Sequence, residues 1–316
     1  MTATVFSSPV RSASPSTPIQ IRGLTKTYPN GFQALKGVNL DIPMGMFGLL
    51  GPNGAGKSSL MRTIATLQEA SEGTIQWGDI NVLEEKVKVR QVLGYLPQSF
   101  GVYPGVSAEK LLDHFAALKG ITNSKERKEL VKHLLQQVNL YDARDRAVSG
   151  FSGGMRQRFG IAQALIGDPR LVIVDEPTAG LDPAERVRFL NLLSEISERA
   201  AIILSTHIVE DVSELCPQMA VLIAGQIRAT GQPMGLMQQL AGKVWRIKLR
   251  RDELPTYEEK CRVLSTRFFM GDIIARIYSE SDPGAGFEAV EPDLEDVYFC
   301  VMKEIPALQS SNGAIP

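Results

Sequence analysis

The sequence predicts an α/β fold, and three features of the chain indicate it. Short apolar runs at 46–50, 171–174 and 201–204 have the length and composition of buried parallel strands. Segments with helical spacing of apolar residues alternate with these runs. A helical insert at about 99–160 interrupts the alternation, and a hairpin signal at 219–229 adds antiparallel sheet.

The composition is typical of a globular protein. The chain has 316 residues, 44% of them hydrophobic, which allows a real core and suggests about two domains. Because 34 Lys and Arg balance 35 Asp and Glu, we expect no nucleic-acid partner. The three scattered cysteines fit neither a disulfide framework nor a zinc site. No apolar stretch approaches the ~20 residues that span a bilayer, and we expect no secretory signal.

The first elements follow from alternation and turn residues. Residues 1–18 are rich in Ser, Pro and Thr, which predicts a disordered tail. Alternating apolar residues at 19–21 and 38–42 predict strands, with a turn at 28–31 between them. The apolar run 46–50 then stops at a glycine-rich turn, as a buried parallel strand does.

The middle of the chain alternates helices with buried strands. Amphipathic spacing or a capping residue predicts helices at 107–118, 124–138, after Ser152 and at about 184–198. Buried strands are expected at 171–174 and 201–204. The segment 219–229 breaks at Ala224 and Gly225, so it predicts an antiparallel hairpin.

The last part of the chain, 240–305, predicts a small separate α+β domain. Strands are expected at 244–249 and 273–277. Pro292 is expected to open a helix with acidic residues from Asp293 onward in its first turn, where the helix dipole favours anions. Residues 306–316 are expected to form a tail.

A glycine-rich motif follows the predicted strand 46–50 and precedes a helical stretch. Residues 51–58 (GPNGAGKS) fit G-x-x-x-x-G-K-[ST], whose backbone N–H groups surround phosphate. Lys57 supplies a charge to the β- and γ-phosphates, and the Ser58 hydroxyl can ligate Mg²⁺. The nucleotide-binding residues expected here are Gly51, Pro52, Asn53, Gly54, Ala55, Gly56, Lys57, Ser58 and Ser59. The alternative, a glycine-rich turn by chance, is disfavoured by the flanking strand and helix.

Two acids end the predicted strand 171–174. Asp175 is placed to hold Mg²⁺, directly or through water. Glu176 points elsewhere and can deprotonate the water that attacks the γ-phosphate. Acids at a strand end are common at solvent-exposed positions, but their combination with the phosphate loop favours catalysis.

Residues 151–155 (FSGGM) complete a pattern of motifs. Ser152 alone would indicate only a helix cap. The order of phosphate loop, helical insert, Ser-Gly-Gly and acid pair resembles the ATP-binding subunits of ABC (ATP-binding cassette) transporters. The resemblance covers roughly 19–232 and implies a P-loop ABC ATPase core with an antiparallel β subdomain and a helical subdomain at about 99–160. The substitutions Phe151, Met155 and Ala179 depart from the commonest family pattern, while the central Ser-Gly-Gly is intact.

The resemblance also implies roles for individual residues. Tyr28 matches the aromatic residue that stacks on adenine, and His207 the histidine that contacts the γ-phosphate. Gln98 matches the glutamine that touches Mg²⁺ and water and links to the membrane partner. Asp182 belongs to the loop that crosses the dimer interface. The signature residues that contact the γ-phosphate held by the other subunit are Ser152, Gly153 and Gly154. The expected catalytic residues are Lys57, Glu176 and His207, and the expected Mg²⁺ ligands are Ser58, Gln98 and Asp175.

The resemblance implies partners as well. One phosphate loop and one signature per chain imply a dimer of two copies with ATP between them. In this family a polytopic membrane permease docks on the helical insert, so the subunit is expected peripherally on the cytoplasmic face of the cell membrane. Residues 292–299 (PDLEDVYF) resemble the Leu-Glu-Asp-Val-Phe ending of ABC-2-type exporter ATPases, which favours export.

Three alternatives stay open at this stage. A soluble ABC ATPase is one, although no long coiled coil or second cassette is present in the sequence. An adaptor that binds ATP without turnover is another, and the intact Glu176 and His207 argue against it. An importer ATPase is the third, and only the C-terminal domain argues against it.

Overall fold

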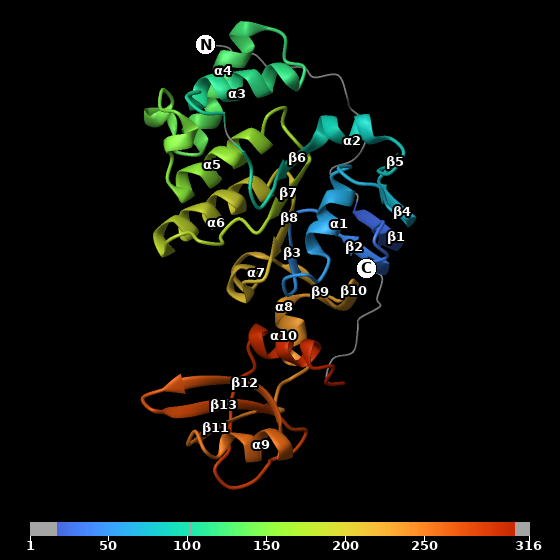
Figure 1. Cartoon of the computed structure of the whole chain (residues 1–316), viewed down its shortest axis with the longest axis vertical. Helices are drawn as coiled ribbons and strands as arrows, with labels where there is room; N and C mark the ends of the chain where they lie inside the picture. The colour runs from blue at the N-terminus through green and yellow to red at the C-terminus, as the bar shows by residue number, and fades with distance from the viewer. Residues whose placement is uncertain (1–17, 102, 307–316) are drawn as a thin grey trace.

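The computed structural model describes residues 18–101 and 103–306 (Figure 1). Helices α3 and α4 lie at one end of the long axis, a central sheet lies in the middle, and a small sheet lies at the other end. The predicted tails at 1–18 and 306–316 lie outside the described residues, except for residues 18 and 306.

The central sheet has the strand order β10–β9–β3–β8–β7–β6. Its neighbours run parallel, apart from β10, which pairs antiparallel with β9 as the hairpin signal predicted. The strands are β3 (Met46–Leu50), β6 (Leu93–Leu96), β7 (Leu171–Asp175), β8 (Ala201–Thr206), β9 (Gln218–Ile223) and β10 (Gln226–Gly231).

The central sheet is buried on both faces. In β7, Val172 and Val174 pack into one apolar core, while Leu171 and Ile173 pack into the other. Successive side chains of a strand point to opposite faces, so a strand covered on both sides needs a continuous apolar run. This is why the short apolar runs of the sequence located these strands correctly.

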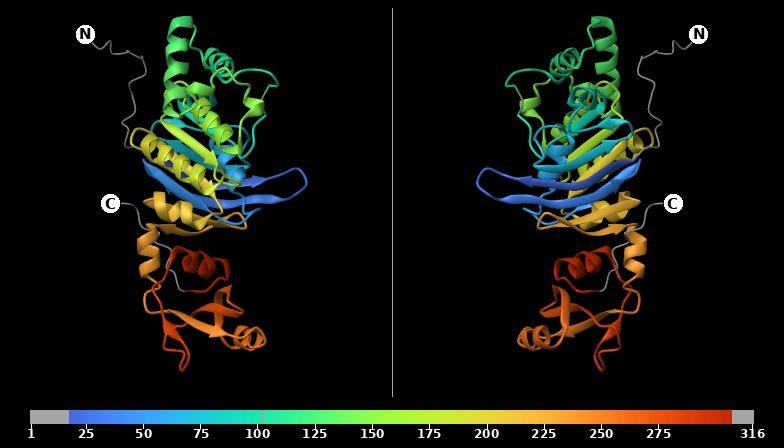
Figure 2. Two further views of the ribbon diagram at one scale, coloured as in Figure 1. Left: turned by 90° about the vertical axis from the view of Figure 1, so that its left-hand side faces the viewer. Right: turned by 90° about the vertical axis from the view of Figure 1, so that its right-hand side faces the viewer.

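One face of the central sheet packs against α1 (Lys57–Ile64) and an antiparallel sheet with the order β2–β1–β4–β5. The strands of that sheet are β1 (Ile19–Thr27), β2 (Gln33–Ile42), β4 (Glu72–Trp77) and β5 (Ile80–Asn81). Figure 2 shows β1 and β2 as a long hairpin that extends sideways from the body. Helix α2 (Lys86–Val92) leads from this sheet into β6.

The other face carries the helical insert. Its helices are α3 (Ala108–Leu118), α4 (Ser124–Gln137) and α5 (Gly153–Ala164), with 3₁₀ turns at Tyr141–Ala143 and Val148–Gly150. Helices α6 (Pro183–Ser197) and α7 (Val209–Leu215) complete this face. The predicted helices are confirmed to within a residue or two at each end.

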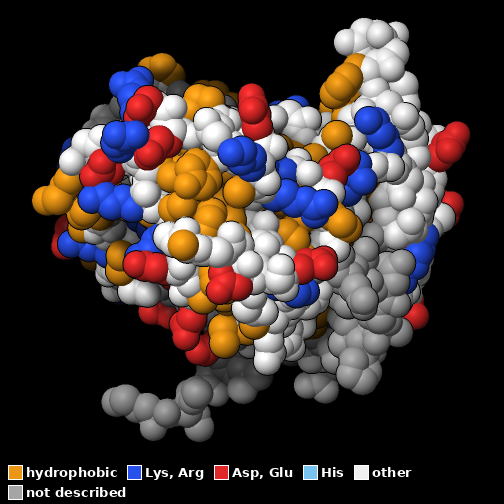
Figure 3. Space-filling view, turned by 90° about the horizontal axis from the view of Figure 1, so that it is seen from below, with side chains coloured by type: hydrophobic (Ala, Val, Ile, Leu, Met, Phe, Trp, Pro, Cys, Tyr) orange, Lys and Arg blue, Asp and Glu red, His pale blue; other side chains and the backbone are white. Residues whose placement is uncertain are grey.

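The small sheet has the order β12–β13–β11–β14 and encloses its own apolar core. It consists of β11 (Val244–Leu249), β12 (Arg262–Phe269), β13 (Asp272–Tyr278) and β14 (Glu288–Ala289), with α9 (Leu254–Lys260) before β12. The end of the molecule shown in Figure 3 carries apolar side chains among charged ones. The end of β12 exposes Phe268 and Phe269, and the turn into β13 exposes Met270.

Helix α10 (Leu294–Met302) joins the small sheet to the larger body, with α8 (Pro233–Gln238) beside it. It packs on α7, α8 and β9 on one side and on β12 on the other. The expectation that Pro292 opens this helix with Asp293 in its first turn is wrong, because the helix begins at Leu294. Asp293 is the N-cap, since its side chain accepts the N–H of Asp296 at 2.9 Å.

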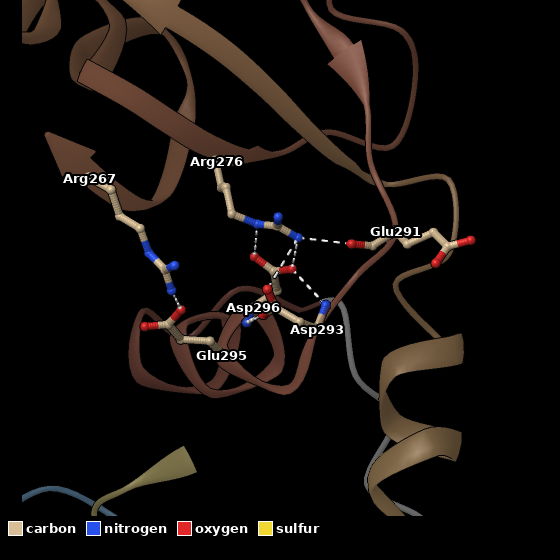
Figure 4. Close-up of polar contacts among 6 residues, drawn as sticks. All are labelled: Arg267, Arg276, Glu291, Asp293, Glu295 and Asp296. Carbon is tan, nitrogen blue, oxygen red and sulfur yellow. Dashed lines mark hydrogen bonds and ion pairs between the residues drawn. The ribbon is translucent and has the colours of Figure 1, made fainter. Parts of the chain in front are cut away.

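An ion pair fastens α10 to β13 (Figure 4). Arg276 donates to both carboxylate oxygens of Asp296, with Nε at 2.7 Å from Oδ1. Its Nη2 also donates to the Glu291 carbonyl at 2.9 Å. The Asp296 side chain is 1% exposed and that of Arg276 is 20% exposed, so each charge offsets the burial of the other.

Cys216 and Cys300 pack into the apolar core beside the central sheet. Burial raises the pKa of each thiol to about 12, so both remain thiols at neutral pH.

We expect Asp296→Asn to lower the free energy of unfolding by about 3 kcal/mol, because Arg276 then lacks its charge partner. The control is Asp272→Asn, since Asp272 pairs at 2.7 Å with Lys248, which is 65% exposed. An exposed pair contributes about 0–1 kcal/mol. Urea denaturation followed by circular dichroism measures both variants. Equal losses of stability would contradict the structural role given to the buried pair.

Candidate functional site

The candidate site lies where three parallel strands end. Strand β8 pairs with both β3 and β7, and the register places Leu50 beside Thr206 and Asp175 beside Ser205. The phosphate loop after β3, the acid pair at the end of β7 and the histidine after β8 therefore emerge at one edge of the sheet. The carboxyl edge of a parallel sheet is where such folds bind their ligands.

The phosphate loop curls tightly between β3 and α1. A Cβ on Gly51 would lie 2.3 Å from the carbonyl oxygen of Leu222, so only glycine fits there. Gly56 has φ of 107°, a conformation that glycine adopts without strain, and α1 begins at the next residue. No side chain caps this helix N-terminus, so its first N–H groups remain donors for an anion.

The three predicted catalytic residues form one chain of contacts. Lys57 Nζ donates to the carbonyl oxygens of Gly51 at 2.6 Å and Pro52 at 3.2 Å. It also lies 3.1 Å from Glu176 Oε1, and both side chains are 5% exposed. The other carboxylate oxygen of Glu176 lies 2.6 Å from His207 Nδ1. The structure thus brings together the lysine, the acid and the histidine that the sequence placed in separate motifs.

The backbone of Glu176 has an unusual conformation. Its φ is 51°, in the left-handed region that non-glycine residues rarely occupy. Its N–H donates to the Ser205 carbonyl at 2.8 Å, which keeps the residue attached to β8 beyond the end of the strand. This conformation turns the Glu176 side chain toward Lys57 and His207, away from the direction of Asp175.

Asp175 and Ser58 provide the oxygen atoms that suit a magnesium ion bound to phosphate. The Asp175 side chain is 2% exposed, and its Oδ1 accepts the Ser205 hydroxyl at 2.9 Å. Its Oδ2 remains as an acceptor, and Ser58 lies in the first turn of α1. Within the described residues, no cluster of three or more Asp, Glu, His or Cys side chains could hold a metal. One carboxylate and one hydroxyl fit Mg²⁺, which takes most of its other ligands from phosphates and water.

Gln98 lies at the same edge. It follows β6, which runs parallel to β7 with Leu96 beside Val174, and its side chain is exposed. Tyr95 of β6 lies near Asp175. Burial, with a smaller contribution from the charge of Asp175, raises the pKa of the Tyr95 phenol.

Tyr28 is fixed against the phosphate loop from the tip of the β1–β2 hairpin. Its hydroxyl lies 3.0 Å from Ser59 Oγ and donates to Gln68 Oε1 at 3.1 Å. The half-buried ring stacks on Phe32 with centroids 6.5 Å apart, and Lys26 Nζ lies 5.4 Å from its centroid. An aromatic ring beside Ser59 can contact a base whose phosphates enter the loop.

The Ser-Gly-Gly signature lies apart from this chain of contacts. Ser152 caps α5 by accepting the N–H of Met155 at 3.2 Å, and Ser152 and Gly153 are exposed. A Cβ on Gly154 would lie 2.4 Å from Glu185 Oε2, so α6 approaches α5 closely here. Asp182, also exposed, caps α6 at 2.9 Å from Glu185 N. Ser152, Gly153 and Asp182 thus lie on the surface of the chain.

Several residues that shape the site were missed from the sequence. Ser205 holds Asp175, and Gln68 holds Tyr28. Asp211 accepts hydrogen bonds from Thr178 and Arg186, which lie on other elements. The only signal for these residues is that they lie close in sequence to the motifs.

Comparison with known proteins identifies the family. The ABC transporter family model matches residues 35–179. The ABC transporter ATP-binding protein YxlF of Bacillus subtilis (strain 168) is 33% identical over 243 residues, which cover 77% of this chain and 80% of that protein. The chain belongs to the ABC transporter family of ATP-binding proteins. The predicted family and its ABC-type ATPase class are confirmed.

Other relatives agree with this placement. The daunorubicin/doxorubicin resistance ATP-binding protein DrrA of Streptomyces peucetius is 32% identical over 273 residues, covering 86% of this chain and 80% of that protein. The ATP-binding cassette MJ0796, solved as a post-hydrolysis dimer bound to ADP and Pi, has a TM-score of 0.62. It is 25% identical and covers 68% of this chain and 98% of its own. The predicted ABC ATPase fold is therefore confirmed.

In the part of the chain that the structure describes, none of the helices is long and apolar enough to cross a membrane.

We expect Lys57→Ala to lower the affinity for ATP by up to about 100-fold, since a charge-assisted contact contributes up to ~3 kcal/mol. Isothermal titration calorimetry measures the affinity, and circular dichroism checks that the variant folds. Lys86→Ala is the control, because Lys86 pairs with Glu69, which is 72% exposed and outside the site. Unchanged ATP affinity in a folded Lys57→Ala variant would overturn the phosphate-loop assignment.

Proposed function

We propose that this ABC-type ATPase works as a dimer of two copies, hydrolyses ATP with Mg²⁺, and drives export through a separate membrane subunit. The observation that supports the chemistry best is the chain of contacts from Lys57 through Glu176 to His207 at the end of the phosphate-loop strand. We assign the catalytic roles to these three residues and nucleotide binding to residues 51–59 and Tyr28.

Binding of ATP rearranges the charges of the site. Before binding, the ammonium group of Lys57 is held by Glu176 and by two loop carbonyls. The triphosphate presents more negative charge than one carboxylate, so it takes Lys57 as its partner. Glu176 then no longer pairs with Lys57, so its carboxylate can accept a proton from water while it is still oriented by His207.

Hydrolysis follows from that geometry. A water molecule attacks the γ-phosphorus and transfers a proton to the Glu176 carboxylate. The bond from the γ-phosphorus to the bridging oxygen breaks, and ADP leaves with the electron pair. His207 and Lys57 stabilise the charge on the γ-phosphate oxygens. The Ser58 hydroxyl, the Asp175 carboxylate and Gln98 would hold Mg²⁺, which neutralises charge between the β- and γ-phosphates when it is bound.

The second copy would supply the missing side of the site. Ser152 and Gly153 lie on exposed surface at the N-terminus of α5, with Gly154 buried behind them, and the positive end of a helix dipole favours phosphate there. Asp182 lies in the exposed loop that would cross the interface. ATP therefore holds two copies together while its γ-phosphate satisfies both faces, and loss of phosphate lets them separate.

The membrane partner is inferred from relatives and from the helical insert. DrrA is named for daunorubicin/doxorubicin resistance, and LnrL of Bacillus subtilis (strain 168) for linearmycin resistance. Such names favour export, here by a permease docked near Gln98 and the insert at 99–160, on the cytoplasmic face of the membrane. We assign residues 19–232 to the nucleotide-binding domain and 240–305 to an accessory domain.

Glu176→Gln should keep ATP binding, reduce turnover by about 1,000-fold or more, and trap the dimer. The amide cannot accept the proton of the attacking water, while the contacts to the nucleotide persist. Phosphate release and size-exclusion chromatography with Mg-ATP measure the two effects. Normal hydrolysis by this variant would show that another group is the base.

Ser152→Arg should leave ATP binding to the single chain intact and abolish the ATP-dependent dimer. The large cation fills the surface where the γ-phosphate of the partner's ATP is expected. The variant is made in the Glu176→Gln chain, so that dimerisation is read without turnover. A dimer that persists would argue against the signature's place in the interface.

The experiment for the membrane partner uses tagged Glu176→Gln chain in detergent-solubilised membranes with Mg-ATP. Captured proteins are identified by mass spectrometry, and the Lys57→Ala chain is the matched control. Recovery of a polytopic membrane protein with the first chain only would support transport. Recovery of soluble proteins alone would favour the soluble ABC class.

A further inference from the structure

Asp211 is a buried carboxylate to which the proposed chemistry gives no role. It lies in α7, and its exposed fraction is 0%. Its Oδ2 accepts the hydroxyl of Thr178, and its Oδ1 accepts Arg186 Nε at 2.6 Å. Thr178 is itself buried, with an exposed fraction of 3%. A carboxylate in such a position needs partners that satisfy it, and here they come from two other elements.

Each element joined at Asp211 leads to a part of the site. Thr178 follows Glu176 by two residues. Helix α7 begins at Val209, two residues after His207. Arg186 lies in the first turn of α6, directly after the 179–182 loop that ends in the cap Asp182.

These links close a small ring. Glu176 Oε2 contacts His207 Nδ1 at 2.6 Å on one side, and Thr178 donates to Asp211 on the other. The chain segments 176–178 and 207–211 form the remaining two sides. The Glu176–His207 contact is therefore one side of a ring, and the hydrogen bond from Thr178 to Asp211 is the opposite side.

We propose that Asp211 is a positioning residue that sets the distance between Glu176 and His207 through Thr178, and holds the interface loop through Arg186. The inference deepens the proposed function and rests on the roles given there to Glu176 and His207.

Asp211 can position these residues because its helix, α7, packs tightly on the central sheet. A Cβ on Gly48 of β3 would lie 2.7 Å from Val212 Cγ1, so the helix lies directly on the strand that leads into the phosphate loop. Cys216 Sγ lies 3.2 Å from the same position. Asp211 is thus carried by a helix that packs directly on β3, and Thr178 and Arg186 are attached to that helix through it.

Glu185, the neighbour of Arg186 in α6, contacts the signature helix α5. Glu185 pairs with Arg158 of α5 at 3.3 Å, and it occupies the space beside Gly154. The first turn of α6 therefore contacts the signature helix through Glu185 and α7 through Arg186. Movement of the signature by a bound partner would reach Glu176 and His207 along this route.

The test compares Thr178→Val with Thr178→Ser in the full-length chain. Valine keeps the shape but cannot donate to Asp211, while serine keeps the hydroxyl. We expect kcat for ATP hydrolysis to fall about 10- to 100-fold in Thr178→Val, as for other residues that orient a catalytic group. We expect KM for ATP to change less than about threefold, and Thr178→Ser to recover most of the kcat.

A double-mutant cycle separates positioning from a loss of general stability. In a His207→Ala background, Thr178→Val should lower the residual rate by less than about threefold, because the contact between Glu176 and His207 whose distance it sets no longer exists. Asp211→Asn is measured in the same way. Glu288→Gln is the control, since Glu288 pairs with Arg246 in the small sheet, away from the site.

The outcomes distinguish the two proposals. If Glu176→Gln and His207→Ala lose turnover while Thr178→Val and Asp211→Asn keep the kcat of the unaltered chain, the positioning role is wrong and the proposed chemistry stands. Equal effects of Thr178→Val with and without His207 would also overturn the positioning role. Normal turnover in Glu176→Gln would overturn the proposed chemistry itself.

Discussion

Everything at the site depends on the parallel pairing of β8 with β3 and β7. That pairing places the ends of the three strands at one edge, with Leu50 beside Thr206 and Asp175 beside Ser205. A shift of one residue in either register would turn every side chain to the opposite face of the sheet. The close packing of side chains of different shape in the two cores opposes such a shift, so the packing of the sheet fixes the geometry of Lys57, Glu176 and His207.

The Lys57–Glu176 ion pair is buried at the phosphate loop. Both side chains are 5% exposed, and the cost of removing two charges from water largely offsets their attraction. Such a pair holds the loop in order without stabilising the substrate-free state strongly. A triphosphate replaces Glu176 as the partner of Lys57 because it carries more negative charge than one carboxylate. The positive φ of Glu176 and the carbonyl contacts of Lys57 define the backbone conformation around the pair.

Motifs in the sequence predicted the parts of the site that are continuous in the chain. The phosphate loop, the acid pair and His207 each follow a buried apolar run, and these runs are easy to recognise because both faces of the sheet are covered. The hydrogen bonds from Thr178 and Arg186 to Asp211 could not be predicted, because they join elements that meet only through tertiary packing. The same holds for Glu185 beside Gly154. The start of α10 was misplaced because capping by Asp293 overrode the preference of proline for the first helical turn.

In the proposed dimer, ATP lies between the phosphate loop of one copy and the Ser-Gly-Gly signature of another. Vanadate trapped with Mg-ADP takes the place of the γ-phosphate, and ultraviolet light then cleaves the backbone next to it. Mass spectrometry of the fragments locates the cuts. We expect cleavage both within residues 51–59 and at Ser152, with the second cut lost in the Ser152→Arg chain. Cleavage confined to the phosphate loop would contradict the proposed dimer.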